Sequence, residues 1–405
     1  MRLVHTADWH LGLDFYEISR LPEQIVFLDW LADTLCRLEV DALLVAGDVF
    51  NTIAPSTLAQ RAYFDFLTRI TRTLPKLQIV ITAGNHDSGA RLEAPSALLK
   101  NLNIHIKGSV EHNPSDYTID YNQFAIPLKD RVGNEYLCLA IPFLRANDCP
   151  PCQNESESYT EAFYRELAAH FATDSRPKIC MGHLYASGTS LSDAKDIEYI
   201  PIGGLEGVSL AQYFTSYAYV ALGHIHCQQC VYFADNVRYS GAPIATTFVH
   251  REQAQGVIVV DIDDGKTIAT FESFDSPLKL IKYSGTPTEL LVQLQGLPER
   301  AVDDFAPIIA VEVVDETPPP PSFKQEVEAV LKGRYARRGP STFKSSAQLT
   351  QELSTVSQPS ALDHRYEPEE IAEREYQKRN NGAGFPEHLK RLLQEAIEEA
   401  RQCEY

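Results

Sequence analysis

Carboxylate, imidazole and amide side chains follow apolar runs at five places in the chain. The segments are HTADWH (5–10), GDVF (47–50), GNHD (84–87), MGH (181–183) and LGHIH (222–226). The residues in them that can do chemistry are Asp8, His10, Asp48, Asn85, His86, Asp87, His183, His224 and His226. Because an open α/β sheet binds ligands beyond the carboxyl ends of its strands, we expect these side chains to meet at one site.

The types of these residues suit divalent metal ions. Oxygen and imidazole ligands without thiolate favour Mn²⁺, Fe²⁺ or Zn²⁺ over Ca²⁺. There are more candidates than one ion needs, so the sequence predicts two ions about 3.5–4 Å apart that share a carboxylate. Asp48 ends the apolar run DALLVAG, and two cations would compensate for its buried charge. Such a pair can hold a phosphate diester and generate the attacking hydroxide.

His86 is the expected general acid, because it lies next to a predicted ligand and histidine is the side chain that most often transfers protons in catalysis. We expect Asp87 to orient the ring of His86. Each motif also has an ordinary explanation, since Gly-Asp is common in turns at strand ends and most histidines are not ligands. The occurrence of all five motifs at strand ends favours a functional site.

The elements that must position these residues alternate between strand and helix over the first 110 residues. Apolar runs at 1–6, 41–47, 77–84 and 104–108 predict strands, and helical spacing predicts helices over 22–38, 56–73 and 89–102. Strands that are apolar on both faces indicate a parallel sheet covered by helices. Between about residue 118 and residue 280 the predicted strands follow one another closely. They start with YTIDYNQFAI (117–126), and a predicted helix over 156–171 interrupts them. An Asp-Gly pair at 264–265 predicts a hairpin turn.

The sequence divides into four predicted parts. Residues 1–277 carry the motifs, and 278–345 form a small α+β capping domain with two strands and two helices. A Ser/Thr/Gln-rich stretch covers 341–361, and we assign 346–361 as a linker. Residues 362–405 form a C-terminal helical segment. Its second helix places Leu389, Leu392, Leu393, Ala396, Ile397 and Ala400 on one face.

Composition limits the class of protein. The formal net charge of −19 argues against a protein that coats nucleic acid by itself, but a local groove or a partner could supply positive charge. The chain has no run of 18 apolar residues and no signal peptide, so we expect a cytoplasmic location. The pairs CPPC (149–152) and CQQC (227–230) could build a four-Cys zinc site. Ordinary reduced thiols are the favoured alternative, because the pairs are far apart and lack knuckle-like glycines.

The motifs DWH, GDVF, GNHD, GH and GHIH resemble the five motifs of the calcineurin-like metallophosphoesterases. HTADWHLG, IPFLRAND (141–148), SDAKDI (192–197) and VRYSGAPI (237–244) are similar to bacterial nuclease subunits of that superfamily. The resemblance implies an α/β fold with a metallophosphoesterase β-sandwich flanked by helices. It implies one metal on Asp8, His10, Asp48 and His226. It implies the other metal on Asp48, Asn85, His183 and His224, with His86 as the catalytic histidine.

The resemblance also implies an activity and partners. It implies two Mn²⁺ ions, with Mg²⁺, Fe²⁺ or Zn²⁺ as alternatives, and a homodimer. The expected dimer contact is a surface helix, either 56–73 or 89–102. It implies a DNA exonuclease and, with ATP and an SMC-like ATPase, an endonuclease that also cleaves hairpins, in DNA repair, recombination and replication. We expect the C-terminal helices to dock on that ATPase, and the alternative is that they pack back on the nuclease domain of the same chain.

One position departs from some relatives, which carry a histidine three residues after the bridging aspartate. This chain has Asn51, whose amide can position a phosphate but cannot act as an acid. Two other functions stay open at this point. One is a small-molecule or cyclic-nucleotide phosphodiesterase with the same metal site. The other is an inactive scaffold, which the complete ligand set disfavours.

Overall fold

The computed structural model describes residues 1–154, 156–187, 189, 210–214, 217–231, 234–345, 386 and 389–390. The chain divides into two compact units, Met1–Phe343 and Lys344–Tyr405. The predicted linker (346–361) lies outside the described residues, and so does nearly all of the predicted C-terminal helical segment. In the part of the chain that is described, no helix is both long and apolar enough to cross a membrane.

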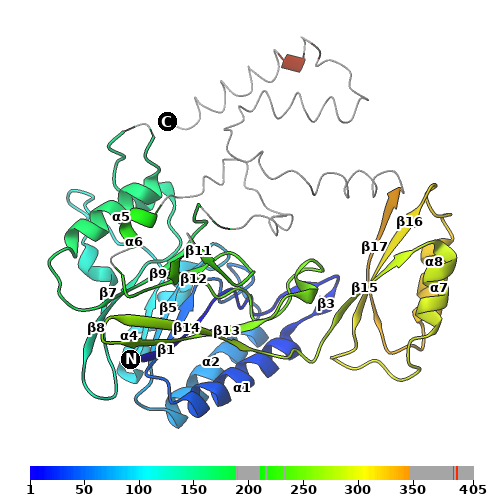
Figure 1. Cartoon of the computed structure of the whole chain (residues 1–405), viewed down its shortest axis with the longest axis horizontal. Coiled ribbons are helices and arrows are strands. Elements are labelled where there is room, and N and C mark those ends of the chain that lie inside the picture. Colours follow the sequence, from blue (N-terminus) through cyan, green and yellow to red (C-terminus); the bar gives the residue numbers. More distant parts are fainter. Residues whose placement is uncertain are drawn as a thin grey trace. The chain divides into compact units, whose positions relative to one another are not determined.

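Two six-stranded sheets form most of the first unit (Figure 1). The first sheet has the order β14-β13-β1-β4-β5-β6, with bounds Lys266–Ser273, Gly256–Asp263, Arg2–Thr6, Ala42–Ala46, Gln78–Thr82 and Ile104–Lys107. The second has the order β11-β12-β10-β9-β8-β7, with bounds Gln229–Val231, Ala234–Tyr239, Tyr219–Gly223, Lys178–His183, Glu135–Ala140 and Ala125–Lys129. Strands β1, β4, β5 and β6 run parallel, as do β8, β9, β10 and β12.

Alternate residues of the central strands serve two cores. Leu44 and Val80 of the first sheet share the apolar layer between the sheets with Ile179 and Ala221 of the second. The opposite face of the first sheet packs on α1 (Leu21–Leu38) and α2 (Thr57–Thr73), and the outer face of the second packs on α5 (Tyr159–His170) and α6 (Ala211–Phe214). Both faces of the central strands are therefore buried, which explains their continuous apolar runs. The predicted α/β sandwich flanked by helices is confirmed.

A third, three-stranded sheet occupies the range predicted for the capping domain. Its order is β15-β16-β17, with bounds Leu280–Gly285, Ile308–Asp315 and Arg337–Ser345. Helices α7 (Pro287–Gln295) and α8 (Phe323–Leu331) pack on this sheet over a core of their own. The strand β17 was not expected, because its polar sequence carries no apolar alternation. The boundary at 277/278 stays a prediction, since Met1–Phe343 forms one compact unit.

Two predicted elements differ from the structure for identifiable reasons. The expected helix over 89–102 consists of α3 (Gly89–Glu93), α4 (Ser96–Leu99) and a 3₁₀ turn, Lys100–Leu102, because Pro95 interrupts it. The expected strand over 117–126 is instead a 3₁₀ turn, Tyr121–Phe124, that leads into β7. The Asp120 carboxylate accepts the Asn122 backbone N–H at 3.0 Å and so starts the turn.

The remaining short elements lie in connections. A small hairpin joins β2 (Asp14–Phe15) and β3 (Ile18–Ser19), and 3₁₀ turns cover Ala146–Asp148 and His250–Glu252. The predicted Asp-Gly hairpin turn is present between β13 and β14, where Asp264 and Gly265 both have positive φ.

Candidate metal centre

The residues of the five motifs all lie at or just beyond the carboxyl ends of strands. Asp8 and His10 follow β1, Asp48 follows β4, Asn85 to Asp87 follow β5, His183 ends β9, and His224 and His226 follow β10. Strands from both sheets therefore contribute side chains to one site.

The backbone is strained at four residues of this site. Asp8, His10, Asp48 and His224 have φ values of 54°, 46°, 50° and 98°, in the left-handed region that costs non-glycine residues about 1–3 kcal/mol each. Backbone hydrogen bonds hold the loops in this form, since the Asp8 N–H donates to the Gly47 carbonyl and the His10 N–H to the Asp48 carbonyl, at 3.0 and 2.9 Å. The strain aims these side chains into the site.

A close backbone approach also explains a glycine of the GNHD motif. A Cβ on Gly84 would lie 2.1 Å from Oδ1 of Asp48, so any side chain there would displace the carboxylate. The motif therefore needs glycine for space at this position.

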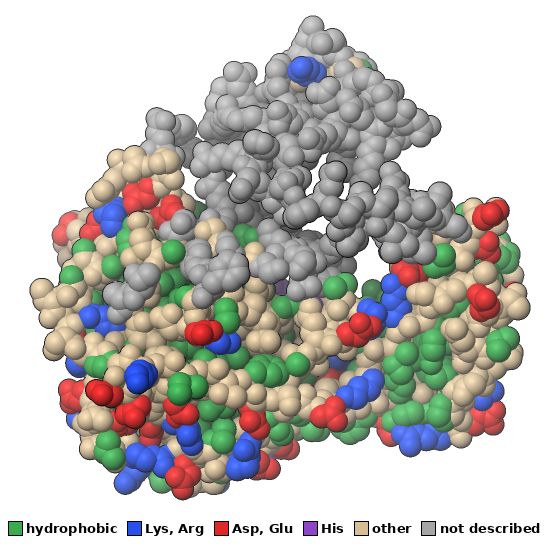
Figure 2. Space-filling view, in the orientation of Figure 1, with side chains coloured by type: hydrophobic (Ala, Val, Ile, Leu, Met, Phe, Trp, Pro, Cys, Tyr) green, Lys and Arg blue, Asp and Glu red, His purple; other side chains and the backbone are tan. Residues whose placement is uncertain are grey.

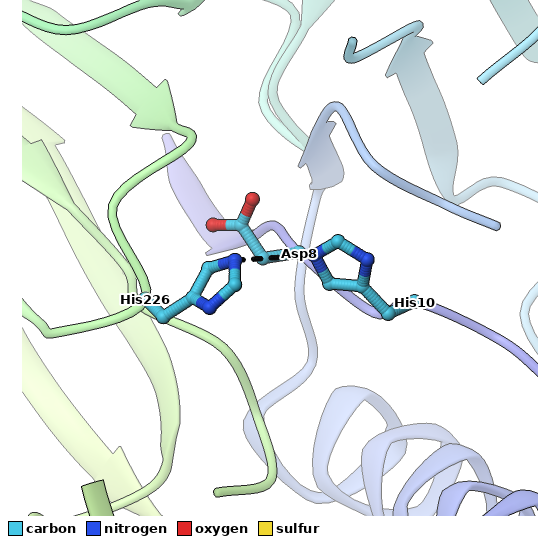
Figure 3. A group of neighbouring side chains, drawn as sticks. All are labelled: Asp8, His10 and His226. Carbon is cyan, nitrogen blue, oxygen red and sulfur yellow. Dashed lines mark hydrogen bonds between the residues drawn. The ribbon is translucent and has the colours of Figure 1, made fainter. Parts of the chain in front are cut away.

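The first group of ligands comprises Asp8, His10 and His226. Figure 3 shows the two imidazole rings facing each other from the segments after β1 and β10, with the Asp8 carboxylate beside them. The Nε2 atoms of His10 and His226 are 3.1 Å apart. One candidate ligand atom from each of the three residues lies within 4.8 Å of the others. This spacing allows all three to bind one ion.

The second group surrounds Asp48. Its Oδ2 lies 3.3 Å from Nε2 of His183. Oδ1 of Asn85 lies 3.0 Å from the same nitrogen and 3.1 Å from Nδ1 of His224. Oδ2 of Asp48 is also 3.6 Å from Nε2 of His10, which belongs to the first group. Asp48 therefore lies between the two groups, where a bridging ligand must be.

The charge states of His10, His224 and His226 favour cation binding, whereas His183 must release a proton before it can bind a metal ion. Burial lowers the pKa of His10 to about 4 and that of His224 to about 3, and it also lowers the pKa of His226 well below the usual value. Burial opposes the charge of His183 too, but the Asp48 carboxylate outweighs it and raises the pKa of His183 to about 9. Nδ1 of His183 donates to the Ala46 carbonyl at 2.9 Å, which directs Nε2 toward Asp48.

The same residues fit a pair of divalent cations. Two carboxylates, Asp8 and Asp48, are almost fully buried near each other, and burial raises the pKa of Asp8 to about 7. Buried like charges need compensation by positive charge. The surrounding imidazoles and the Asn85 oxygen complete a set of oxygen and nitrogen donors that suits Mn²⁺, Fe²⁺ or Zn²⁺. The predicted use of divalent metal is therefore supported by the donor set.

The residues after β5 have different partners from those expected. Nδ1 of His86 lies 3.0 Å from the backbone carbonyl of Asn51, so this carbonyl orients the ring. We expected Asp87 to do so. Instead, the Asp87 carboxylate accepts the backbone N–H groups of Val49, Phe50 and Gly84 at 3.1, 2.9 and 2.9 Å. Asp87 therefore joins the loops that follow β4 and β5.

His86 has a second possible role. Its ring centroid lies 4.8 Å from that of His10, and one ring nitrogen lies within 4.8 Å of a candidate ligand atom of His10 and of Asp48. A metal ligand and a proton donor are therefore both compatible with this position.

Two functional candidates were missed in the sequence. The Thr246 hydroxyl lies 2.9 Å from Nδ1 of His226, and 3.2 Å from Nδ1 of His250. Both residues belong to ATTFVH (245–250), which follows no strand end directly and matches none of the five motifs. Only the presence of another histidine beside two threonines could have drawn attention to this segment.

The CxxC pairs do not form a cluster in the described structure. Cys152 is exposed, and Sγ of Cys227 donates to Oε1 of Gln253 at 2.8 Å. The described residues contain no group of cysteines placed to share a metal ion. The ordinary-thiol alternative fits these surroundings.

Buried carboxylates and imidazoles at the strand ends of a two-sheet α/β sandwich define a metal-dependent phosphoesterase. Residues 1–228 match the family described as calcineurin-like phosphoesterase, and the chain belongs to this family.

Similar proteins indicate a narrower group within this family. Three of these relatives are D subunits of the nuclease SbcCD. The chain is 40% identical over 276 residues to the D subunit of Rhodobacter capsulatus, and the match covers 65% of this chain and 67% of that protein. It is 35% identical over 291 residues to the one from Escherichia coli K12, with 69% of each chain covered. It is 31% identical over 307 residues to the one from Bacillus subtilis, with 74% of each chain covered.

Proposed function

We propose that this chain is the nuclease component of an SbcCD-like complex. It would be a Mn²⁺-dependent double-strand DNA exonuclease and, with ATP and an SbcC-like SMC ATPase, an endonuclease that also opens hairpins. The observation that carries this proposal is a set of buried and half-buried donors that the described strand ends bring together, in a chain similar to D subunits of SbcCD over about two thirds of its length. These donors are Asp8, His10, Asp48, Asn85, His183, His224 and His226.

The residues would divide between two cations. Asp8, His10, Asp48 and His226 would hold one, and Asp48, Asn85, His183 and His224 the other. When bound, such a pair supplies Lewis-acid stabilisation of the phosphate and lowers the pKa of water. The chain itself supplies the fixed geometry. The strained backbone at Asp8, His10 and Asp48 holds their side chains in place before substrate arrives.

His86 would supply the proton for the leaving oxygen. Its Nδ1–H donates to the Asn51 carbonyl, which leaves Nε2 as the atom that can give a proton to substrate. Asn51 thus orients His86 through its backbone carbonyl, and an amide in place of a histidine side chain at this position leaves that interaction in place. Asp87 would support the site by holding two loops together.

The wider assembly is part of the same proposal. The chain would act as a homodimer in the cytoplasm, in DNA repair, recombination and replication. The alternative is a small-molecule or cyclic-nucleotide phosphodiesterase with the same metal site. The separate α+β sheet of β15, β16 and β17 favours a larger substrate, because a compact diesterase has no need of it.

A comparison of substrates tests the proposal. The purified chain is incubated with Mn²⁺ and either linear duplex DNA or bis(p-nitrophenyl) phosphate, with and without the ATPase and ATP. We expect degradation of the duplex by the chain alone and hairpin cleavage only with ATPase and ATP. Turnover of the small diester without any cleavage of DNA under either condition would overturn the proposal and favour the alternative.

A further inference from the structure

A chain of hydrogen bonds leads from His226 away from the metal centre. Nδ1 of His226 lies 2.9 Å from the Thr246 hydroxyl, and that hydroxyl lies 3.2 Å from Nδ1 of His250. Thr246 and His250 are 8% and 5% exposed, so solvent does not readily replace these bonds. The imidazole rings of His226 and His250 lie 5.9 Å apart between centroids.

The chemistry of the three groups fixes the direction of this chain. Nε2 of His226 faces Nε2 of His10 inside the ligand group, so a cation would meet its lone pair there. Nδ1 of His226 must then carry the proton and donate it to the Thr246 oxygen. A hydroxyl has one proton and two lone pairs, so Thr246 can accept from His226 and at the same time donate its own proton to Nδ1 of His250. One arrangement of protons therefore satisfies both bonds and leaves His226 ready to bind metal.

The loop that carries Thr246 is firmly attached to the rest of the fold. The Ala242 N–H donates to the His226 carbonyl at 2.9 Å, which joins this loop to the ligand loop. Nη1 of Arg20 donates to the Ala245 carbonyl at 3.0 Å. Arg20 is itself buried and paired with Glu23 at 2.6 Å. A rigid loop can hold a ligand ring at a fixed angle.

We propose that Thr246, supported by His250, is a positioning residue that sets the tautomer and orientation of His226 for cation binding. This inference rests on the proposed function, because it assumes a cation in the ligand group of Asp8, His10 and His226. Thr246 acts only through His226 and does not contact the reacting atoms.

Metal titration of matched variants tests the inference. Thr246→Val removes the hydroxyl at nearly constant volume, Thr246→Ser keeps it, and Thr247→Val removes a neighbouring hydroxyl that lies 3.4 Å from His250. Titration calorimetry with Mn²⁺ should show one of two sites weakened about 10–100-fold in Thr246→Val, the usual effect of losing a partner of a metal ligand. Thr246→Ser and Thr247→Val should bind both ions as the wild type does.

The outcomes separate the inference from the function on which it rests. Wild-type affinity in Thr246→Val, or an equal loss in Thr247→Val, would overturn the role of Thr246 while the metal site stands. A wild-type chain that binds no divalent cation would instead overturn the proposed function.

A measurement on the metal-free wild type covers the case in which Thr246→Val does not fold. Nitrogen-15 NMR of the histidine rings should show the proton of His226 on Nδ1. A proton on Nε2 of His226 would contradict the inference without the use of any variant or activity.

Discussion

Asp48 divides its two carboxylate oxygens between the backbone and the imidazole ligands. Oδ1 accepts the His86 N–H at 2.9 Å, and Oδ2 faces His183 and His10 at 3.3 and 3.6 Å. Burial opposes its charge, but His183 outweighs burial and the pKa of Asp48 falls below its usual value. Asp48 is therefore ionised at neutral pH and available to two cations at once.

Replacing Asp48 by asparagine should remove the shared negative charge without changing the shape of the side chain. We expect Asp48→Asn to lose measurable phosphodiesterase activity and to bind both Mn²⁺ ions more weakly, because each ion loses a ligand. Metal content after dialysis, measured by plasma mass spectrometry, checks this. Retention of one ion at full affinity would show that Asp48 does not bridge.

His86 should behave differently, since the proposal makes it a proton donor. His86→Ala should keep both ions and lose about 10²–10⁴-fold in turnover of DNA, the usual contribution of a general acid. His170→Ala provides the control, because this exposed histidine lies outside the metal groups. If His86→Ala also loses a metal ion, its role is that of a ligand, which its distance from Asp48 and His10 permits.

At the scale of secondary structure, one pair of side chains joins the two sheets. His5 of β1 is fully buried, and its Nδ1 lies 2.9 Å from the hydroxyl of Tyr219 on β10. Burial lowers the pKa of His5 to about 3. The folded state therefore holds this ring neutral at a pH where the unfolded chain takes up a proton.

This difference predicts a contribution to the pH dependence of stability. The unfolded pKa is 6.5 and the folded pKa is lower, so His5 reduces the free energy of unfolding as the pH falls from about 6.5 toward 3. The slope is about 1.4 kcal/mol per pH unit for one proton. Urea unfolding of the metal-free protein at several pH values should show a slope in His5→Gln that is smaller than the wild-type slope by this amount. Equal slopes in the two proteins would contradict the pKa shift of His5.

The sequence predicted the elements whose burial leaves a pattern. The strands β1, β4 and β5 lie within the predicted ranges, because both their faces are apolar. The candidate ligands could be identified because they are polar residues that directly follow these apolar runs. The strand β17 escaped prediction because its residues do not alternate in polarity.

The interactions that could not be predicted are those made by the backbone. The partners of Asp87 are three main-chain N–H groups, and the partner of the His86 ring is a main-chain carbonyl. Because almost every residue carries a backbone N–H and a carbonyl, the amino-acid sequence does not indicate which of these groups will bond to a given side chain. Thr246 was missed because its contact with His226 spans 20 residues and depends on how a loop folds back.

At the scale of the whole molecule, the acidic charge bears on how DNA would be held. Figure 2 shows acidic and basic side chains intermixed on the visible described face, without a broad basic patch. Phosphate contacts require clustered Lys and Arg. The formal net charge of −19 is therefore compatible with DNA binding only if another face or a partner supplies that cluster.

Removal of residues after 345 tests where the partner binds. Strand β17 ends at Ser345, and the compact first unit ends at Phe343, so this truncation leaves the described sheets complete. We expect the truncated chain to keep both Mn²⁺ ions and its exonuclease activity, and to lose co-purification with the ATPase and ATP-stimulated cleavage. Unchanged affinity for the ATPase would place the docking surface before residue 346.

The pairing of β1 limits the order in which the first sheet can assemble while the chain is being translated. Its two neighbours are β4, which follows soon after, and β13, whose residue Asp261 pairs with Arg2. A ribosome must therefore translate beyond residue 261 before the first strand gains its second neighbour. Until then β1 presents an open edge, which is prone to pair with other chains. His226 is translated late as well, so the nascent chain carries Asp8 and His10 long before it can assemble a working site.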